Sequence, residues 1–322
     1  MAVLLFLVGV VAVIGGAELV VRGGARVAAR LGISPLVIGL TVVAIGTSAP
    51  ELAVGIDAAL RGNGALALGN IAGTNTVNLL FIFGLVAVIR PLPLTRQTIR
   101  VDLPFMIAAA VALFVMGLDG KLTTTEGIIL IAGAVVFTTL TVLNARRQSV
   151  VVREEYAAEY GTTKSSRPKL DLLVNVMLLI AGIVIIVIGA DWLVDGAVEL
   201  AAQFGVSDAF IGLTVVAIGT SAPEIVTAIV ATIRNERDIA VGNLLGSSVY
   251  NILVILGVTA VVPEGDIPVP TELAFVDIPV MLAATLACIP VFLTRRLVTR
   301  LEGAIFMSAY AAYLAYLIIA RS

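Results

Sequence analysis

The strongest constraint on this chain is a thirteen-residue stretch that occurs twice. Residues 39–51 read GLTVVAIGTSAPE, and residues 212–224 repeat the same thirteen letters. Each copy places a helix-breaking Gly-Thr-Ser-Ala-Pro, and then a glutamate, inside an otherwise apolar segment. Membrane proteins interrupt a helix and bury a charge where a substrate or an ion has to be held. The doubled stretch therefore predicts two matched binding elements within a membrane.

Composition supports the membrane assignment. Hydrophobic residues make up 60% of the chain and charged residues 13%, whereas a soluble domain carries roughly 25% charged residues. Apolar runs of about 20 residues, the length needed to cross the hydrocarbon core, recur along the chain. A β-barrel would instead show short alternating strands. We expect an all-α polytopic membrane protein.

The residue inventory limits the chemistry. The chain has no histidine and one cysteine, Cys288, which excludes histidine-based zinc, haem and triad sites. A bound metal must therefore use oxygen ligands, as hard cations such as Na⁺, Ca²⁺ and Mg²⁺ do. A paired-aspartate protease signature is also missing. We expect no enzymatic activity, no resident cofactor and no nucleic-acid partner.

Ten apolar segments follow one another along the chain. They span about 2–21, 34–60, 65–89, 101–118, 125–144, 171–194, 207–233, 239–262, 271–293 and 301–319. The apolar start lacks a basic region, so we interpret it as a first spanning helix and not as a cleaved signal. The polar stretch between the fifth and sixth segments divides the chain into a first repeat (1–145), a cytoplasmic linker (146–170) and a second repeat (171–322).

The two halves match throughout their length. An offset of 173 relates Glu51 to Glu224 and Asn78 to Asn251, and offsets of 175 and 176 relate later pairs. This indicates an internal duplication. Because each half has five segments, an odd number, the second half must enter the membrane from the opposite side. We expect ten transmembrane helices in two inverted-topology five-helix repeats, with discontinuous helices 2 and 7.

Loop charges set the orientation. With the N-terminus outside, seventeen Lys and Arg residues fall in inside loops and three fall outside. This bias follows the positive-inside rule. Both termini are predicted to lie outside the cell.

Glu51 and Glu224 lie near the middle of their segments, where a charge costs ~2.5–3.5 kcal/mol on insertion scales. No Lys or Arg lies in the middle of any segment, so an internal ion pair is excluded, and a protonated structural glutamate remains the alternative. Pro50 and Gly46 should loosen the helix and free backbone carbonyls. Thr47 and Ser48 can share a face with Glu51, giving an all-oxygen cation site.

The third and eighth segments carry a second matched set. Thr74 and Asn78 are four residues apart, as are Ser247 and Asn251, so each pair can face one cavity. Polar packing between helices is the alternative interpretation. Asp57 is interpreted as a snorkelling residue, or as part of an entry path. Asp102 and Asp277 are interpreted as interfacial or N-terminal charges and not as ligands.

These doubled motifs, Gly-Thr-Ser-x-Pro-Glu and Gly-Asn-x-x-Gly-Ser/Thr-x-x-x-Asn, resemble the two alpha repeats of the calcium/cation antiporter superfamily, and most closely its prokaryotic sodium/calcium exchanger branch. The resemblance covers essentially the whole chain. It implies a prokaryotic cell membrane, bound Ca²⁺ and Na⁺ as transported ions, lipid as surroundings, and movement of the first and sixth helices across a rigid core. The ligand positions that it implies, by side chain or carbonyl, are Ala44, Thr47, Ser48, Glu51, Thr74, Asn78, Ala217, Thr220, Ser221, Glu224 and Ser247.

One departure concerns Asn251. Exchangers of this type typically carry Asp at that position, so this site has two carboxylates and not three. We include Asn251 in the ligand set and expect exchange of Ca²⁺ for Na⁺ by alternating access. A proton/calcium or other monovalent/divalent exchanger is the alternative, and a cation channel is a further one.

Overall fold

The computed structural model describes residues 1–159, 168–203, 217–263 and 265–321. This part of the chain is helical apart from four two-residue strands. It contains eight helices long and apolar enough to span a membrane, and nine when Pro35–Thr47 and Ala49–Leu60 are taken as one broken span. The expected all-α membrane fold is confirmed. Part of the expected seventh segment, residues 207–216, lies outside the described residues.

The helices run in the order α1 (Ala2–Leu31), α2 (Pro35–Ile38), α3 (Ala44–Thr47), α4 (Ala49–Leu60), α5 (Gly64–Thr76), α6 (Phe83–Ile89), α7 (Leu103–Gly117), α8 (Thr124–Glu159), α9 (Pro168–Gln203), α11 (Ala217–Thr220), α12 (Ala222–Ile233), α13 (Arg237–Tyr250), α14 (Gly257–Val261), α15 (Ile278–Arg295) and α16 (Arg300–Arg321). Wider π-helical turns are η1 (Gly39–Val43), η2 (Val77–Ile82), η3 (Thr98–Asp102), η5 (Asn251–Leu256) and η6 (Leu273–Asp277). The strands are β1 (Leu92–Pro93), β2 (Lys121–Leu122), β3 (Ile267–Pro268) and β4 (Leu297–Val298).

The chain forms two compact units. Unit 1 comprises Met1–Thr47 and Val142–Asn243, and unit 2 comprises Ser48–Thr141 and Leu244–Ser322. Each unit therefore draws on both sequence halves. These units do not coincide with the two expected sequence repeats, 1–145 and 171–322. The repeats stay a prediction. Two helices contribute to both units, since one boundary falls within α8 and another within α13.

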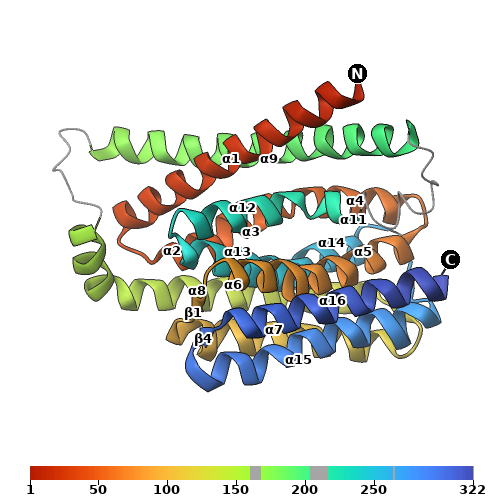
Figure 1. The fold of residues 1–322 in the computed structure, drawn as a ribbon. Coiled ribbons are helices and arrows are strands. Elements are labelled where there is room, and N and C mark those ends of the chain that lie inside the picture. Colours follow the sequence, from red (N-terminus) through yellow and green to blue (C-terminus); the bar gives the residue numbers. More distant parts are fainter. Residues whose placement is uncertain (160–167, 204–216, 264, 322) are drawn as a thin grey trace. The chain divides into compact units, whose positions relative to one another are not determined.

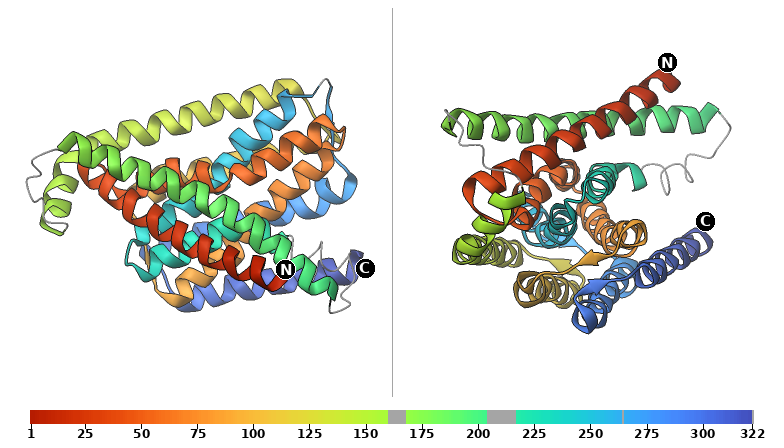
Figure 2. Two further views of the ribbon diagram at one scale, coloured as in Figure 1. Left: turned by 90° about the horizontal axis from the view of Figure 1, so that it is seen from above. Right: turned by 60° about the vertical axis from the view of Figure 1, so that its left-hand side comes forward.

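In unit 1, α1 and α9 lie side by side along much of their length (Figures 1 and 2). Glycines recur at seven-residue spacing on both helices, at Gly9 and Gly16 of α1 and at Gly182 and Gly189 of α9. A Cβ added to Gly16 would lie 2.8 Å from the carbonyl oxygen of Gly182. Small residues let two membrane helices approach this closely.

Helix α1 is longer than the hydrophobic pattern predicted. It continues past residue 21 to Leu31 and ends at Gly32, which adopts the left-handed conformation with φ of 66°. Glycine stops a helix in this way without steric strain. Glu18 therefore lies inside a helix and not near its end, and Arg22 of the same helix and Arg234 after α12 both pair with it.

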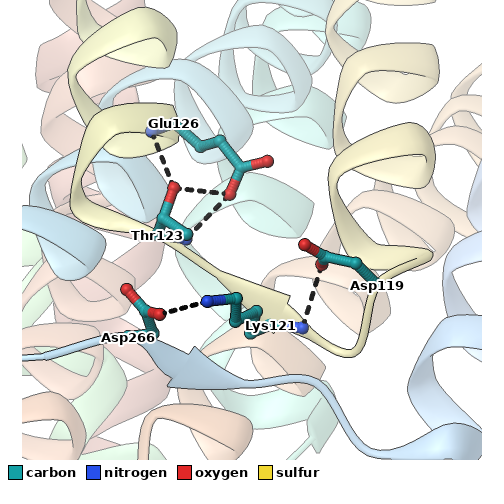
Figure 3. A network of polar contacts seen from close by, with 5 residues as sticks. All are labelled: Asp119, Lys121, Thr123, Glu126 and Asp266. Carbon is teal, nitrogen blue, oxygen red and sulfur yellow. Dashed lines mark hydrogen bonds and ion pairs between the residues drawn. The ribbon is translucent and has the colours of Figure 1, made fainter.

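Unit 2 contains two short antiparallel strand pairs between loops. β1 pairs with β4 and β2 pairs with β3. Beside β2, Thr123 and Glu126 form a reciprocal cap at the start of α8, and Lys121 Nζ donates to Asp266 at 2.8 Å (Figure 3). That hydrogen bond raises the pKa of Lys121 above its ordinary value. The caps and pairs fix where the flanking helices begin.

The described part of the expected linker is largely helical. α8 continues from the membrane segment to Glu159, and α9 already begins at Pro168. Proline is well suited to this position because the first turn of a helix needs no backbone donor. The remaining linker residues, 160–167, lie outside the described part of the chain.

Candidate functional site

Both copies of the doubled stretch break a helix at serine. α3 ends at Thr47 and α4 begins at Ala49, so the interruption falls at Ser48. In the second copy, α11 ends at Thr220 and α12 begins at Ala222. The described residues thus contain the discontinuities that the proline and glycine pattern predicted for helices 2 and 7.

The break places each glutamate in the first turn of a new helix. Glu51 follows Pro50 in α4, and Glu224 follows Pro223 in α12. Their exposed fractions are 1% and 0%. The N-terminal end of a helix carries a partial positive charge, which favours a carboxylate in the first turn. This field offsets part of the cost of burying each charge.

The glycine of each copy has a packing role in addition to loosening the backbone. A Cβ on Gly46 would lie 2.6 Å from the Ile183 side chain of α9, and a Cβ on Gly219 would collide with Val194 of the same helix. Both broken segments therefore pass very close to α9 within unit 1. The sequence predicted a flexible backbone at these glycines but not the neighbour that requires them.

Unit 2 holds six of the predicted ligands, which we call the unit 2 polar group. They come from α4 and the residue before it, from α5 and η2, and from α13 and η5. Each is at most 4% exposed. The group consists of Ser48, Glu51, Thr74, Asn78, Ser247 and Asn251.

One hydrogen bond and two π-helical turns organise the unit 2 polar group. Ser48 Oγ donates to Ser247 Oγ at 3.1 Å. Asn78 is the second residue of η2, and Asn251 is the first residue of η5. A π-helical turn widens the helix and redirects its side chains, and such turns are frequent at functional sites. No sequence pattern predicted these turns.

The amides of the unit 2 polar group contain buried atoms suited to a ligand. Three of these atoms have no hydrogen-bond partner within the described part of the chain: Nδ2 and Oδ1 of Asn78, and Oδ1 of Asn251. Leaving a buried polar atom without a partner costs about 1–3 kcal/mol. A hard cation takes oxygen ligands and would remove this cost for the two amide oxygens, Asn78 Oδ1 and Asn251 Oδ1. The donor chemistry therefore fits a bound Na⁺ or Ca²⁺.

Unit 1 holds the other six predicted ligands, which we call the unit 1 polar group. Thr47 Oγ1 donates to Asn243 Oδ1 at 3.1 Å and lies 3.4 Å from the Ala44 carbonyl oxygen. Ser221 Oγ is buried and has no hydrogen-bond partner among the described residues. The group consists of Ala44, Thr47, Ala217, Thr220, Ser221 and Glu224.

Two buried amides beside these groups were not predicted as site residues. Asn243 accepts the hydrogen bond from Thr47, and Asn75 Oδ1 accepts a hydrogen bond from Asn251 Nδ2. Both are at most 1% exposed. Asn243 belongs to the repeated Gly-Asn pair, and that repetition was the available signal. Asn75 is replaced by Ser248 at the matching position, so the repeat gave no signal for it.

The other acidic residues divide into two kinds. Asp57 is exposed and pairs with Arg61 at 2.9 Å beside a hollow of about 530 Å³. Asp102 and Asp277 are 0% and 5% exposed, and they occupy the N-cap positions of α7 and α15, as expected for charges at helix N-termini. Tyr313 Oη donates to Asp277 at 2.5 Å. This contact comes from α16, 36 residues along the chain, so the sequence around Asp277 does not reveal it.

Comparison with known proteins identifies the family. A family model described as sodium/calcium exchanger protein matches residues 1–143 and 174–319. The chain belongs to this family. CaxA of Alkalimonas amylolytica is 36% identical over 317 residues, covering 97% of each chain. The sodium/calcium exchanger MaX1 of Methanosarcina acetivorans is 30% identical over 349 residues, covering 98% of this chain and 97% of its own.

The exchanger family also includes solved structures that this chain resembles. The sodium/calcium exchanger of Methanococcus jannaschii is 29% identical, with a TM-score of 0.81 and coverage of 98% of this chain and 97% of that one. Family, fold and apolar helices together make the chain an integral membrane protein of a transporter family. They support cation antiport involving Ca²⁺ as the class of activity, and the resemblance found in the motifs is confirmed.

Proposed function

We propose that the protein is a secondary active antiporter that exchanges Ca²⁺ for Na⁺ across a prokaryotic cell membrane by alternating access. One observation carries the proposal. Glu51 and Glu224 are buried, and each begins a helix immediately after a break in a membrane segment. A buried carboxylate with neutral oxygens from nearby residues is suited to a dehydrated hard cation. The family relationship supports the same class of activity.

Charge balance explains why the two ions would exchange. Two carboxylates balance one Ca²⁺ or two Na⁺ ions. If both ions need the same carboxylates, they compete, and the protein crosses between its two states only with one kind of ion bound. An ion shifts the equilibrium between two states only through its differential affinity for them. Competition for Glu51 and Glu224 would therefore couple the two fluxes.

The proposal includes the ligand set and the topology. We assign the unit 1 and unit 2 polar groups as the ligands of the transported ions. We also propose ten transmembrane helices in two inverted repeats with both termini outside. Membrane lipid is the remaining partner. The family model matches two stretches separated by residues 144–173, a division that agrees with the proposed repeats.

Asn251 supports a second candidate, a proton/calcium exchanger. With Asn and not Asp at this position, the ligand set has one negative charge fewer than is typical of exchangers that the motifs resemble. One of the two remaining glutamates would then bind and release a proton, and H⁺ would take the place of Na⁺ as the counter-ion. A cation channel is distinguished by flux without any counter-ion.

Ca²⁺ uptake into proteoliposomes under one imposed gradient at a time tests these candidates. We expect an outward Na⁺ gradient to drive uptake, and outward H⁺ and K⁺ gradients to leave it near the rate without a gradient. Uptake driven by H⁺ alone would support the second candidate. Equal uptake with and without any opposing gradient would make the protein a channel and overturn exchange.

The carboxylates can be tested against a matched control. We expect Glu51→Gln and Glu224→Gln each to lower Na⁺-driven Ca²⁺ uptake at least 100-fold, because each removes a charge that balances the cation. Asp57→Asn changes an exposed carboxylate of the same helix as Glu51 and should retain most of the uptake. Normal uptake in either glutamine variant would remove that residue from the proposed site.

A further inference from the structure

Asn75 lies at the centre of a buried chain of amide contacts in unit 2. Its Nδ2 donates to the backbone oxygen of Ser248 at 3.1 Å and lies 3.7 Å from Met281 Sδ. Its Oδ1 accepts from Asn251 Nδ2, also at 3.1 Å. Asn75 and Asn251 are 1% and 0% exposed. Both halves of the Asn75 amide are therefore engaged.

The Ser248 carbonyl fixes the orientation of the Asn75 amide. A backbone carbonyl can only accept hydrogen bonds, so it requires the NH₂ group of Asn75 on its side. Rotating the amide by half a turn would place Oδ1 about 3.1 Å from another carbonyl oxygen, with no hydrogen between them. Burial makes such an unpaired contact costly. Oδ1 of Asn75 must consequently face Asn251.

This orientation in turn fixes Asn251. The side chain that meets Asn75 Oδ1 has to present a donor, and Asn251 does so with Nδ2. Its Oδ1 is then directed away from Asn75, and it has no hydrogen-bond partner among the described residues. Since cations bind the oxygen of an amide and not its NH₂ group, this is the orientation that a cation site requires.

We infer that Asn75 is a positioning residue that sets which atom Asn251 offers to the transported cation, and that Asn75 and Asn251 form a matched pair selecting a neutral side chain at position 251. The inference rests on the proposed function. A carboxylate at position 251 would oppose the Asn75 Oδ1 acceptor with a second acceptor. The neutral residue at this position, which departs from the usual Asp, is thus linked to a particular neighbour.

The matched pair also makes the two halves unlike each other. Asn78 corresponds to Asn251, but the counterpart of Asn75 is Ser248. The Ser248 hydroxyl donates to Leu244 of its own helix, at 2.9 Å. Neither amide atom of Asn78 has a hydrogen-bond partner within the described residues. The second half therefore has no amide equivalent to Asn75 that could orient Asn78.

A double-mutant cycle on Ca²⁺ binding tests the inference. The dissociation constant is measured by calorimetry on the purified full-length protein, alongside KM and Vmax of uptake. We expect Asn75→Leu to raise the dissociation constant and KM about tenfold, the effect of one hydrogen bond at a site, with Vmax within twofold. Asn251→Ala should have a similar effect. The double variant should match Asn251→Ala, because Asn75 acts only through Asn251.

Thr76→Val is the matched control. It removes a buried hydrogen bond of the same helix, from Thr76 Oγ1 to the Ala72 carbonyl at 2.8 Å, and should leave Ca²⁺ affinity unchanged. Asn75→Ser, with a side chain too short to bridge both partners, replaces Asn75→Leu if the leucine variant does not fold.

The outcomes separate the two proposals. Effects that multiply in the double variant, or an unchanged affinity in the position 75 variants, would overturn the positioning role while leaving exchange intact. A wild-type protein that binds no Ca²⁺ would overturn the proposed function and this inference with it.

Discussion

At the residue scale, the direction of one hydrogen bond matters for Thr47. Asn243 Oδ1 is the nearer of its two acceptors, at 3.1 Å against 3.4 Å for the Ala44 carbonyl oxygen. A proton directed to Asn243 leaves the lone pairs of Oγ1 available to a cation. A hydroxyl offers one donor and two acceptor positions, and Asn243 occupies the donor position. If the proposed function holds, the buried amide prepares Thr47 as a ligand, as Asn75 is proposed to prepare Asn251.

Thr47→Val tests this arrangement with a side chain of nearly the same shape. We expect KM for Ca²⁺ to rise about tenfold or more, because a ligand oxygen is lost, and unfolding to become easier by about 1–3 kcal/mol because Asn243 loses its donor. Thr41→Val is the control, since Thr41 donates to Val37 within its own turn of helix. Concentration-dependent uptake and thermal unfolding measure the two effects. An unchanged KM for Thr47→Val would exclude a ligand role.

The buried glutamates could be predicted from sequence, and their amide neighbours could not. Glu51 was identifiable because a charge in an apolar segment without a basic partner has few explanations. Asn75 was passed over because a regular helical period places Thr74 and Asn78 on one face. The direction of the Asn78 amide depends on the π-helical turn η2, and that of the Asn75 amide depends on Ser248, which is distant in sequence. Hydropathy does not contain that information.

At the element scale, α1 and α9 contact each other through glycine backbones. The contact recurs where Gly9 meets Gly189 and where Gly16 meets Gly182. The family resemblance implies that these two helices move across the remaining core during transport. A seam of glycines has few protruding side chains, which favours close packing between helices. The pair is therefore suited to move as one body.

Gly16→Ala and Gly15→Ala form a matched test of this seam. A Cβ at Gly16 would lie 2.8 Å from the Gly182 oxygen, whereas a Cβ at Gly15 meets no atom within 4 Å. We expect Gly16→Ala to destabilise the protein by about 1–3 kcal/mol through overpacking, with uptake reduced. Gly15→Ala should be neutral or slightly stabilising, because alanine favours helix. Equal thermal unfolding of the two variants would contradict the close contact.

The length of α1 illustrates what hydropathy misses at this scale. The apolar run weakens near residue 21, but the helix continues because one face still packs through Gly23 and Gly24 while Arg22, Arg26 and Arg30 occupy other positions. An amphipathic extension of a helix is detected from the 3.6-residue period of its apolar residues and not from the average hydropathy of a window. Gly32 marked the true end, as a glycine cap does.

At the scale of the whole molecule, strand pairs test the topology. β2 and β3 pair, so their loops must lie on the same side of the membrane, and the same holds for β1 and β4. The predicted segments place four crossings between the first pair of loops and six between the second. Both numbers are even, as pairing requires. An error of one segment between paired strands would place them on opposite sides, so the pairs agree with the predicted segments that lie between them.

Orientation is the remaining prediction at this scale. The loop before α15 contains no Lys or Arg between residues 262 and 272. Arg295, Arg296 and Arg300 lie at the opposite, C-terminal end of α15. The positive-inside rule then places Thr271 outside the cell and Thr294 in the cytoplasm. Both threonines are exposed, which makes them a matched pair for labelling.

Single cysteines measure this directly. Cys288 is fully buried and is first removed as Cys288→Ala. In intact cells, a membrane-impermeant maleimide should then label the Thr271→Cys variant, and it should label the Thr294→Cys variant only after permeabilisation. The physical reason is that translocating a segment rich in arginine is disfavoured. Labelling of both variants in intact cells would contradict a single crossing by α15. The reverse pattern would place both termini inside, and would invert the side from which each proposed repeat begins.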